Sequence, residues 1–489
     1  MGAREERHAG GRLWRILAWV ADGIVVLLVA AAAANLAFNL DERWFGLDHD
    51  PKADPARVLP PEGLDLAAGS IAPPVAGSAA GGPLDAVAVR RALAPYVHAS
   101  DLGAHVDVAV GELDSDRTVF RSGTGAVTPA STTKLLTATA ALEKLGPATR
   151  FRTTVRQSGG RVILVGGGDP FLATDRASTR GLYPARATLD DLAAQTAAAL
   201  GRQGVTSVRL GYDSSLFAEP RFNPAWPATY AGDVVPPITA LWADEGRGDD
   251  GRYVSDPPQA AAGAFAKLLR THGVTVRGPA RAVTSASADT EIAAVSSAPL
   301  GQIVEHTLAV SDNNAAEVIA HHVGIAVRQD GSFAGGVAGV LEVLRGLGVD
   351  TTGASVYDGS GLSRRDRLSA DTLLDVLRLA GSAEHPELRQ VLTGLPVAGF
   401  TGSLQWRFDD APAAARGRVR AKTGTLTGVS GLAGVITDLD GNRMVFVAIA
   451  DKVAVPKTLA ARHDLDLIAG SLAACHCGTA GAATSGSTS

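Results

Sequence analysis

The sequence predicts an α+β protein in which helices flank an antiparallel sheet, a smaller α/β domain is inserted into this main domain, and an N-terminal membrane helix comes first. Three observations predict this fold class. Strand-like alternation occurs early and late in the folded part of the chain, with helical periodicity between. The stretch 151–293 changes to short strands, turns and one or two helices. An apolar run from Ile16 to Phe38, interrupted by Asp22 and Asn35, is about long enough to span a bilayer.

Residues 1–40 are expected to direct export. Four arginines precede the apolar run and stay on the inner side of the membrane, namely Arg4, Arg7, Arg12 and Arg15. We expect an uncleaved signal-anchor, because the run is longer than a typical signal-peptide core. The alanines at 30–34 also offer the small-residue cleavage site of a signal peptide. In either case the rest of the chain crosses the membrane and is extracytoplasmic, in the cell envelope.

The remaining elements follow a Pro-, Gly- and Ala-rich linker at 41–83. The main domain, 84–150 and 294–477, begins with a helix, a strand pair and a buried helix at 86–97, 105–123 and 131–145. The inserted domain, 151–293, contains a strand with a glycine turn, an amphipathic helix and another strand at 161–173, 188–204 and 207–217. The main domain resumes with helices, three strands ending in a hairpin, and a closing helix at 300–327, 370–381, 416–451 and 458–475. A disordered tail is expected at 478–489.

Charge and cysteine content exclude some functions. The net charge of -5 and the pI near 6.1 argue against a general nucleic-acid binder, which would present a basic face. Cys475 and Cys477 are the two cysteines, separated by a single histidine. An exported protein permits a disulfide between them, whereas this set has too few ligands for zinc. We expect either a terminal clip or two thiols without a catalytic role.

One lysine in a buried segment points to chemistry. Lys134 lies three residues after Ser131 in an apolar run, in a chain with only seven lysines. On a helix this spacing places both side chains on one face. A lysine near another cation in a poorly solvated site is disfavoured as an ammonium, so it can take a proton from a neighbouring hydroxyl. Ser131 is therefore a candidate nucleophile, although a pair with this spacing also arises by chance.

Two further motifs strengthen this hypothesis. Ser311-Asp312-Asn313 lies at or before a helix, and Lys422-Thr423-Gly424 lies at a strand edge. Ser-x-x-Lys, Ser-x-Asn and Lys-Thr-Gly in this order form the motif set of penicillin-binding proteins and class A β-lactamases. Three short motifs in the right order and structural context are improbable by chance.

Six longer stretches of the chain carry a family resemblance, namely "LVGGGDPFL", "GYDSSLFAEPRFNPAW", "VVPPITAL", "SDNNAAEVIA", "YDGSGLSRRDRLS" and "GRVRAKTGTLTGVSGLAG". Over 84–474 the chain resembles the D-alanyl-D-alanine carboxypeptidase/endopeptidase family of low-molecular-mass penicillin-binding proteins. It departs from relatives at Pro236, where serine is frequent, and at Asp366, where asparagine is common. The resemblance implies that the main domain is a penicillin-binding, β-lactamase-like (transpeptidase-like) catalytic domain. Ser131 and Ser311 are 180 positions apart, which implies that the segment between them holds either one inserted domain or two inserted domains of reduced size.

The resemblance also implies an acylation mechanism. Ser131 would attack the carbonyl of a D-Ala-D-Ala bond in a peptidoglycan stem peptide, with Lys134 as general base. Ser311 would relay a proton to the leaving amine, and Asn313 would hold Lys134 and the substrate amide. The backbone N–H groups of Ser131 and Thr425 would form the oxyanion hole. β-Lactam antibiotics would acylate Ser131 as covalent inhibitors, and no metal or cofactor is implied.

A separate set would bind the substrate. Lys422 would attract the terminal carboxylate and disfavour a charged Lys134, while the hydroxyls of Thr423 and Thr425 would bind that carboxylate. Gly424 would leave the strand bare, so that the substrate backbone can lie against it. The turn at 358–363 either borders this site or is only a tight turn.

Three functions remain open. The first is a DD-carboxypeptidase, with or without endopeptidase activity; the second is a β-lactamase-like hydrolase; the third is a catalytically silent cell-wall binding protein. No ExxLN stretch of the class A type lies between Ser311 and Lys422. Gly166–Asp169 lacks the residues of a phosphate-binding loop, and the adjacent His321 and His322 lack a zincin pattern. We expect residues 166–169 to form a turn and both histidines to have a structural role.

Overall fold

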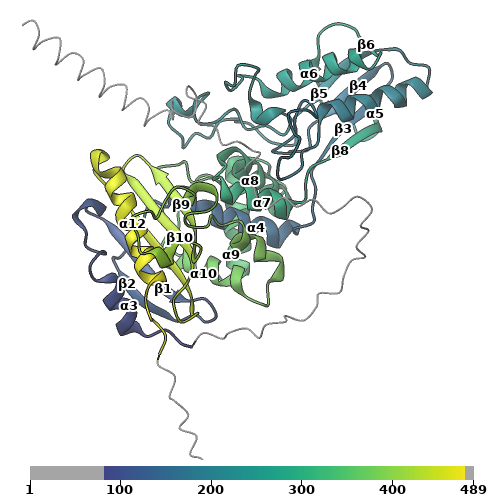
Figure 1. Cartoon of the computed structure of the whole chain (residues 1–489). Helices are drawn as coiled ribbons and strands as arrows, with labels where there is room; N and C mark the ends of the chain where they lie inside the picture. Colours follow the sequence, from purple (N-terminus) through teal and green to yellow (C-terminus); the bar gives the residue numbers. More distant parts are fainter. Residues whose placement is uncertain (1–81, 480–489) are drawn as a thin grey trace, which may run out of the picture. The chain divides into compact units, whose positions relative to one another are not determined.

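The main sheet has five antiparallel strands. The computed structural model describes residues 82–479, and the sheet order is β2-β1-β11-β10-β9. The strands are β1 Val106–Glu112, β2 Thr118–Ser122, β9 Val419–Leu426, β10 Val429–Thr437 and β11 Arg443–Ala450. The predicted strand pair and the three late strands are thus confirmed, and β1 pairs with β11 although they are far apart in sequence. Early and late segments therefore meet in one sheet (Figure 1).

Helices cover both faces of this sheet. Alternate residues of β11 point to opposite sides, as expected for a strand: Val445 and Val447 belong to one core cluster, whereas Phe446 and Ala448 belong to another. The first cluster includes α4 Lys134–Leu145, α7 Leu300–Ala309, α8 Asn313–Arg328, α9 Phe333–Gly346, α10 Ala370–Gly381 and α11 Arg389–Thr393. The second includes α3 Ala86–Leu93 and α12 Thr458–Ala473. The α+β class with flanking helices is therefore confirmed.

A second sheet lies between α4 and α7 in the sequence. Its order is β6-β5-β4-β3-β8, with β7 also paired to β5, and it mixes parallel and antiparallel pairs. The strands are β3 Arg152–Ser158, β4 Arg161–Val165, β5 Ser207–Asp213, β6 Thr275–Val276, β7 Arg281–Ala282 and β8 Thr290–Ser296. Helices α5 Leu189–Arg202 and α6 Pro257–Thr271 contribute to its separate apolar core.

The loop after β4 joins this second sheet to helix α8. The Nε2–H of His322 donates to the carbonyl of Gly168 at 2.9 Å, and the imidazole stacks on Phe151 with ring centroids 3.8 Å apart. His321 is buried and bonds the carbonyl of Glu317 in the same helix. Both histidines are thus held by backbone and aromatic groups, in agreement with the structural role expected of them.

The expected N-terminal membrane helix and linker lie outside the described residues, apart from Gly82 and Pro83. Within 82–479, no helix combines the length and the apolar character needed to cross a membrane.

Candidate active site

Ser131 occupies a 3₁₀ turn and not the α-helix that was predicted to begin there. The turn η3 spans Ala130–Thr133, and α4 follows from Lys134. The turn begins at Ala130, whose φ is 48°. A 3₁₀ turn has about three residues per turn, so side chains at i and i+3 eclipse. The Oγ of Ser131 consequently lies 2.9 Å from the Nζ of Lys134.

Lys134 is enclosed by acceptors. Its side chain is 1% exposed, and besides Ser131 its Nζ donates to Oδ1 of Asn313 and to the carbonyl of Ser360, each at 2.7 Å. A neutral amine has two N–H groups and one lone pair. If Asn313 and Ser360 accept the two N–H groups, the lone pair is left for the hydroxyl of Ser131, which is the arrangement a general base needs.

The electrostatics make this neutral form accessible. Burial lowers the pKa of Lys134 to about 8, while the carboxylates of Asp358, Glu317 and Asp312 act in the opposite direction and raise it. Burial, and not the charge of Lys422, is thus the main cause of the depressed pKa. Desolvation lowers the pKa of Lys422 as well, and the charge of Lys134 adds to that effect.

The Ser-Asp-Asn motif lies where α7 gives way to α8. Ser311 adopts φ of 62°, a left-handed conformation that is uncommon for a residue with a side chain. Asp312 then caps α8, because its carboxylate accepts from the N–H of Ala315 at 3.0 Å. This reversal directs Ser311 to Lys422, whose Nζ donates to Oγ of Ser311 at 2.7 Å. The next residue, Asn313, contacts Lys134 instead.

The Lys-Thr-Gly motif lies on β9, the terminal strand of the main sheet, as predicted. Lys422 is fully buried, and its Nζ also donates to the carbonyl of Thr423 at 3.0 Å. The hydroxyl of Thr423 lies 2.9 Å from Oγ of Ser403, whereas Thr425 is exposed. A Cβ on Gly424 would come within 2.8 Å of the carbonyl of Pro129, so the close approach of η3 requires glycine here, in addition to the role predicted for substrate binding.

The turn at 358–363 borders the site through its backbone. The carboxylate of Asp358 accepts from the N–H groups of Gly361 and Ser363, each at 2.6 Å. Glu317 accepts from Ser360 N–H at 2.8 Å and from Gly359 N–H at 3.2 Å. These bonds hold the Ser360 carbonyl that accepts from Lys134. Of the two alternatives that the sequence left open, the structure favours a turn that borders the site.

The structure therefore brings the predicted catalytic residues and Lys422 together in two groups. Ser131, Lys134 and Asn313 form one group, and Ser311 with Lys422 forms the other. Sequence reasoning missed Glu317 and Ser403. Glu317 looked like an ordinary helix residue, and Ser403 lies in η7 Gly402–Leu404 outside any motif, so the sequence carried no signal for either.

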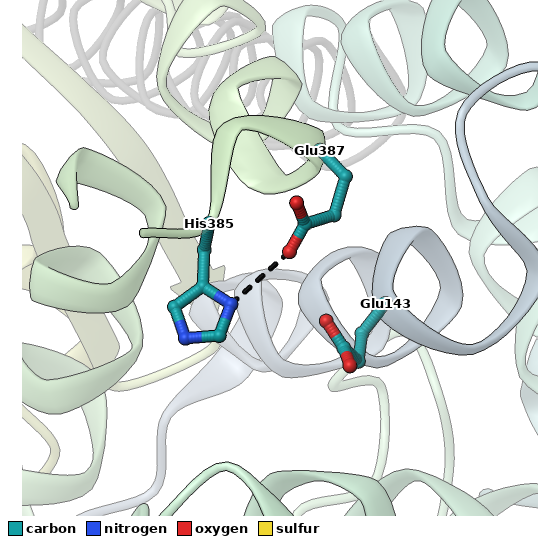
Figure 2. Close-up of side chains that lie close together, drawn as sticks. All are labelled: Glu143, His385 and Glu387. Atoms are coloured by element: carbon teal, nitrogen blue, oxygen red, sulfur yellow. Dashed lines mark hydrogen bonds and ion pairs between the residues drawn. The ribbon is translucent and has the colours of Figure 1, made fainter. Parts of the chain in front are cut away.

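A separate cluster lies at the other end of α4. Glu143, His385 and Glu387 each offer one ligand atom within 4.8 Å of the others, and His385 Nδ1 lies 3.1 Å from Glu387 Oε1 (Figure 2). Glu143 follows Lys134 by nine residues, about 14 Å along a helix. This group is exposed or half-buried and is too far along α4 to act on Ser131.

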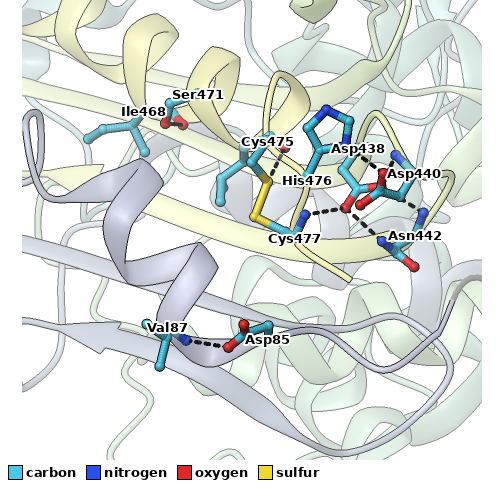
Figure 3. The surroundings of a disulfide bond; sticks show 11 residues. Asp85, Val87, Asp438, Asp440, Asn442, Ile468, Ser471, Cys475, His476 and Cys477 are labelled. Atoms are coloured by element: carbon cyan, nitrogen blue, oxygen red, sulfur yellow. Dashed lines mark hydrogen bonds and ion pairs between the residues drawn. A yellow bond between two sulfur atoms is a disulfide. The ribbon is translucent and has the colours of Figure 1, made fainter. Parts of the chain in front are cut away.

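The cysteines form a disulfide at the end of the closing helix. Cys475 and Cys477 are bonded, which favours the terminal clip among the alternatives. The N–H of Cys477 donates to Asp438 in the hairpin turn, and His476 pairs with Asp440 (Figure 3). Beyond it, Gly478 pairs with Leu84 and the N–H of Thr479 donates to Pro83. The disordered tail was expected from 478, but backbone hydrogen bonds hold these first two residues; 480–489 lie outside the described residues.

Comparison with known proteins identifies relatives across most of the chain. The model of the D-Ala-D-Ala carboxypeptidase 3 (S13) family matches residues 89–249 and 249–472. Carboxypeptidase DacB of Mycolicibacterium smegmatis is 34% identical over 486 residues, which cover 95% of this chain and 99% of that protein. A D-alanyl-D-alanine carboxypeptidase of an Actinomadura species is 32% identical and covers 69% of this chain and 75% of its own.

Solved structures agree on the fold. Penicillin binding protein 4 of Haemophilus influenzae superimposes with a TM-score of 0.64 at 19% identity, covering 78% of this chain and 98% of that chain. A second structure of the same protein, complexed with a β-lactam, gives a TM-score of 0.58 at 21% identity with the same coverage.

Proposed function

Since this chain belongs to the D-Ala-D-Ala carboxypeptidase (S13) family, we propose that Ser131 is the acylated nucleophile of a serine-type D-Ala-D-Ala carboxypeptidase that acts on peptidoglycan stem peptides. The contact that carries the assignment is the 2.9 Å approach of Lys134 Nζ to Ser131 Oγ. It is supported by the two carbonyl oxygens, of Asn313 and Ser360, that occupy the other donors of a neutral amine.

Acylation follows from these positions. Lys134 takes the proton of the Ser131 hydroxyl as Oγ attacks the carbonyl carbon between the two D-alanines. The backbone N–H groups of Ser131 and Thr425 stabilise the oxyanion. When the tetrahedral intermediate collapses, the C–N bond breaks and the amine of the terminal D-alanine takes a proton through Ser311. Water then hydrolyses the ester and regenerates Ser131.

The substrate carboxylate binds beside the buried cation. Lys422 donates to Ser311 and to the backbone carbonyl of Thr423. Its charge therefore attracts the substrate carboxylate without a direct hydrogen bond, while the hydroxyls of Thr423 and Thr425 bind that carboxylate directly. Ser403 holds the hydroxyl of Thr423 at 2.9 Å. Lys422 thereby links carboxylate binding to Ser311, the residue that passes the proton to the leaving group.

A labelled penicillin tests the nucleophile. Because the β-lactam ring mimics the scissile bond, the protein is expected to form a stable adduct on Ser131, located by peptide mass mapping, and Ser131→Ala is expected to form none. Ser115→Ala, at an exposed serine on the main domain, is the matched control and should label fully. A folded protein that fails to label, or an adduct on another residue, would refute the assignment.

Three assays separate the functions that share this site. Release of free D-alanine from a pentapeptide identifies the carboxypeptidase, and cleavage of a crosslinked stem-peptide dimer would add endopeptidase activity. Rapid turnover of the penicillin would indicate a β-lactamase instead. Labelling without any release of D-alanine would indicate a silent binding protein.

The proposed location is the cell envelope, where this substrate occurs. The arginine-flanked apolar run at 16–38 is proposed to export the chain and to anchor it in the membrane. Carbonate extraction of membranes, followed by N-terminal sequencing of the protein, distinguishes a retained anchor from a cleaved signal peptide.

A further inference from the structure

Three buried carboxyl groups surround the turn behind Lys134. Glu317 and Asp366 are fully buried and Asp358 is 1% exposed. Like charges in a poorly solvated region disfavour simultaneous ionisation, so a shared site of this kind retains protons. The cation among them is Lys134, whose pKa Asp358 and Glu317 both raise. One positive charge does not balance three negative charges.

The hydrogen-bond donors around each group indicate which one keeps a proton. Asp358 accepts three hydrogen bonds, two from the turn and one from Trp226 Nε1 at 2.6 Å. Glu317 accepts two, one on each oxygen. Asp366 accepts one, from Tyr357 N–H at 2.9 Å, and its Oδ2 is buried without a donor. Because donors stabilise the ionised form, Asp366 is the least stabilised carboxylate of the three.

The buried Oδ2 of Asp366, which accepts no hydrogen bond, can donate one to a neighbouring acceptor if it is protonated. Asp366 is tied to both sides of Asp358: its Oδ1 accepts from the N–H of Tyr357, the residue before Asp358, and its N–H donates to Ser363, whose N–H donates to Asp358. Two ionised carboxylates cannot bond each other, because both only accept. A protonated Oδ2 instead donates to Asp358 and removes the unsatisfied buried atom. We propose that Asp366 is a protonated carboxylic acid that donates to Asp358 and so positions the turn at 358–363 against Lys134.

This bond acts on catalysis through the backbone. Asp358 anchors the N–H groups of Gly361 and Ser363, and the carbonyl of Ser360 between them accepts from Lys134. Loss of the Asp366 proton would set two carboxylates against each other and displace the turn. Asp366 is accordingly a positioning residue for the base, not a catalytic one. The proposal rests on the proposed function only for this catalytic consequence.

Other charged groups near Asp366 do not neutralise it. Burial and the charge of Asp358 raise its pKa well above the usual range, and Glu317 adds to this effect. The neighbouring guanidinium groups have other partners: Arg365 lies over the Tyr357 ring, and Arg367 donates to Thr128 and to backbone carbonyls. Both arginines are exposed. On the α8 side the titratable group is Glu317, whose pKa burial raises to about 8.

The test compares Asp366→Asn with Asp366→Leu in the full-length protein. Asparagine has nearly the same shape and keeps a neutral donor, whereas leucine removes both the donor and the acceptor for Tyr357. Acylation by labelled penicillin should be at least about tenfold faster in Asp366→Asn than in Asp366→Leu. Above the plateau set by Lys134, loss of the Asp366 proton should slow acylation of the unchanged protein; this fall should move to higher pH in Asp366→Asn, because its amide does not ionise.

Stability against pH gives a readout that is independent of activity. An aspartate with a raised folded pKa keeps its proton when the unfolded chain has lost it, so its contribution to stability falls as pH rises above about 4. In Asp366→Asn this loss of stability with rising pH should not occur, because the amide does not titrate. The Tm of Asp366→Asn minus that of the unchanged protein should therefore increase by at least about 2 °C between pH 5 and pH 8. A difference that falls with pH would overturn the proposal.

A matched control and a spectroscopic arm complete the test. Asp350 is exposed, and bonds from Thr352 lower its pKa, so Asp350→Asn should show no such increase. Infrared difference spectra between the unchanged protein and Asp366→Asn at neutral pH should contain the carbonyl stretch of a protonated carboxyl. Its absence would refute a protonated Asp366 even if Ser131 labels normally, and failure of labelling with this band present would count against the proposed function alone.

Discussion

Among single residues, Lys134 has the environment on which the proposed chemistry depends most. It is buried at the start of α4 and faces neutral oxygens of Ser131, Asn313 and Ser360 rather than a directly bonded carboxylate. Neutral acceptors do not stabilise an ammonium as a carboxylate would, so burial dominates and the pKa falls to about 8. A lysine with this pKa is partly neutral under ordinary conditions and able to accept a proton.

The acylation rate should follow the ionisation of this lysine. Below the pKa of Lys134, about 8, the neutral fraction rises about tenfold for each unit of pH, so the second-order rate of penicillin acylation should rise in parallel and then level off. Stopped-flow measurements between pH 6 and 9 follow this directly. Lys134→Arg, which stays protonated, should be slower by about 10²–10⁴-fold. A rate that is independent of pH below 8 would contradict a neutral lysine base.

Single residues also show what the sequence predicts of a site. The sequence predicts Ser131, Lys134, Ser311, Asn313 and Lys422, because their proposed roles belong to side chains that recur in fixed short motifs. The partner of Lys134 at position 360 contributes a backbone carbonyl, which any residue carries. Only the three-dimensional path of the chain brings that carbonyl to the lysine, so no pattern of side chains reveals it.

At the element scale, the turn at 358–363 forms one wall of the site and depends on a glycine. Gly361 has φ of 82°, and a Cβ there would come within 1.8 Å of the carbonyl of Ala130. Ala130, the residue before Ser131, is therefore in direct contact with this turn. Regular elements such as β9–β11 and α12 were predicted from periodicity, whereas the 3₁₀ start of the Ser131 segment was not, because one turn of either helix type has the same sequence pattern.

Two glycines separate the effect of contact from that of backbone conformation. Gly361→Ala should both strain φ and displace η3, whereas Gly353→Ala, at φ of 74° with no atom within 4 Å, should only strain φ. We expect Gly353→Ala to cost about 1 kcal/mol of unfolding free energy with unchanged penicillin acylation. Gly361→Ala should cost more and slow acylation at least about tenfold. Equal effects of the two substitutions on acylation would show that the turn does not position Ser131.

At the scale of the whole described chain, helix α8 belongs to both halves of the structure. Its first residue, Asn313, bonds Lys134, and His322 further along bonds the loop that follows β4 of the second sheet. Burial lowers the pKa of His322 to about 4. The second sheet is therefore attached through the same helix that contributes Asn313 to the candidate active site.

This attachment should weaken in acid. In the unfolded chain His322 takes up a proton near pH 6.5, whereas in the folded chain it does so only near pH 4. As pH falls from 6.5 to 4, the free energy of unfolding therefore decreases by up to about 3 kcal/mol because of this residue. His322→Gln keeps a donor for Gly168 but does not titrate. Its Tm relative to the unchanged protein should thus increase from pH 7 to pH 5, measured by differential scanning calorimetry. His98→Gln, at an exposed histidine, should show no trend, and a falling difference for His322→Gln would contradict this reading.

The pairing of Leu84 with Gly478, together with the bond from Asp85 N–H to the carbonyl of Cys477, sets the two described ends of the chain side by side. A linker of a few residues would join them, and new termini would then open in an exposed turn such as that at Gly251. The described part of the chain is consequently suited to circular permutation, which would let the second sheet, rather than residues 82 and 479, carry a fused partner.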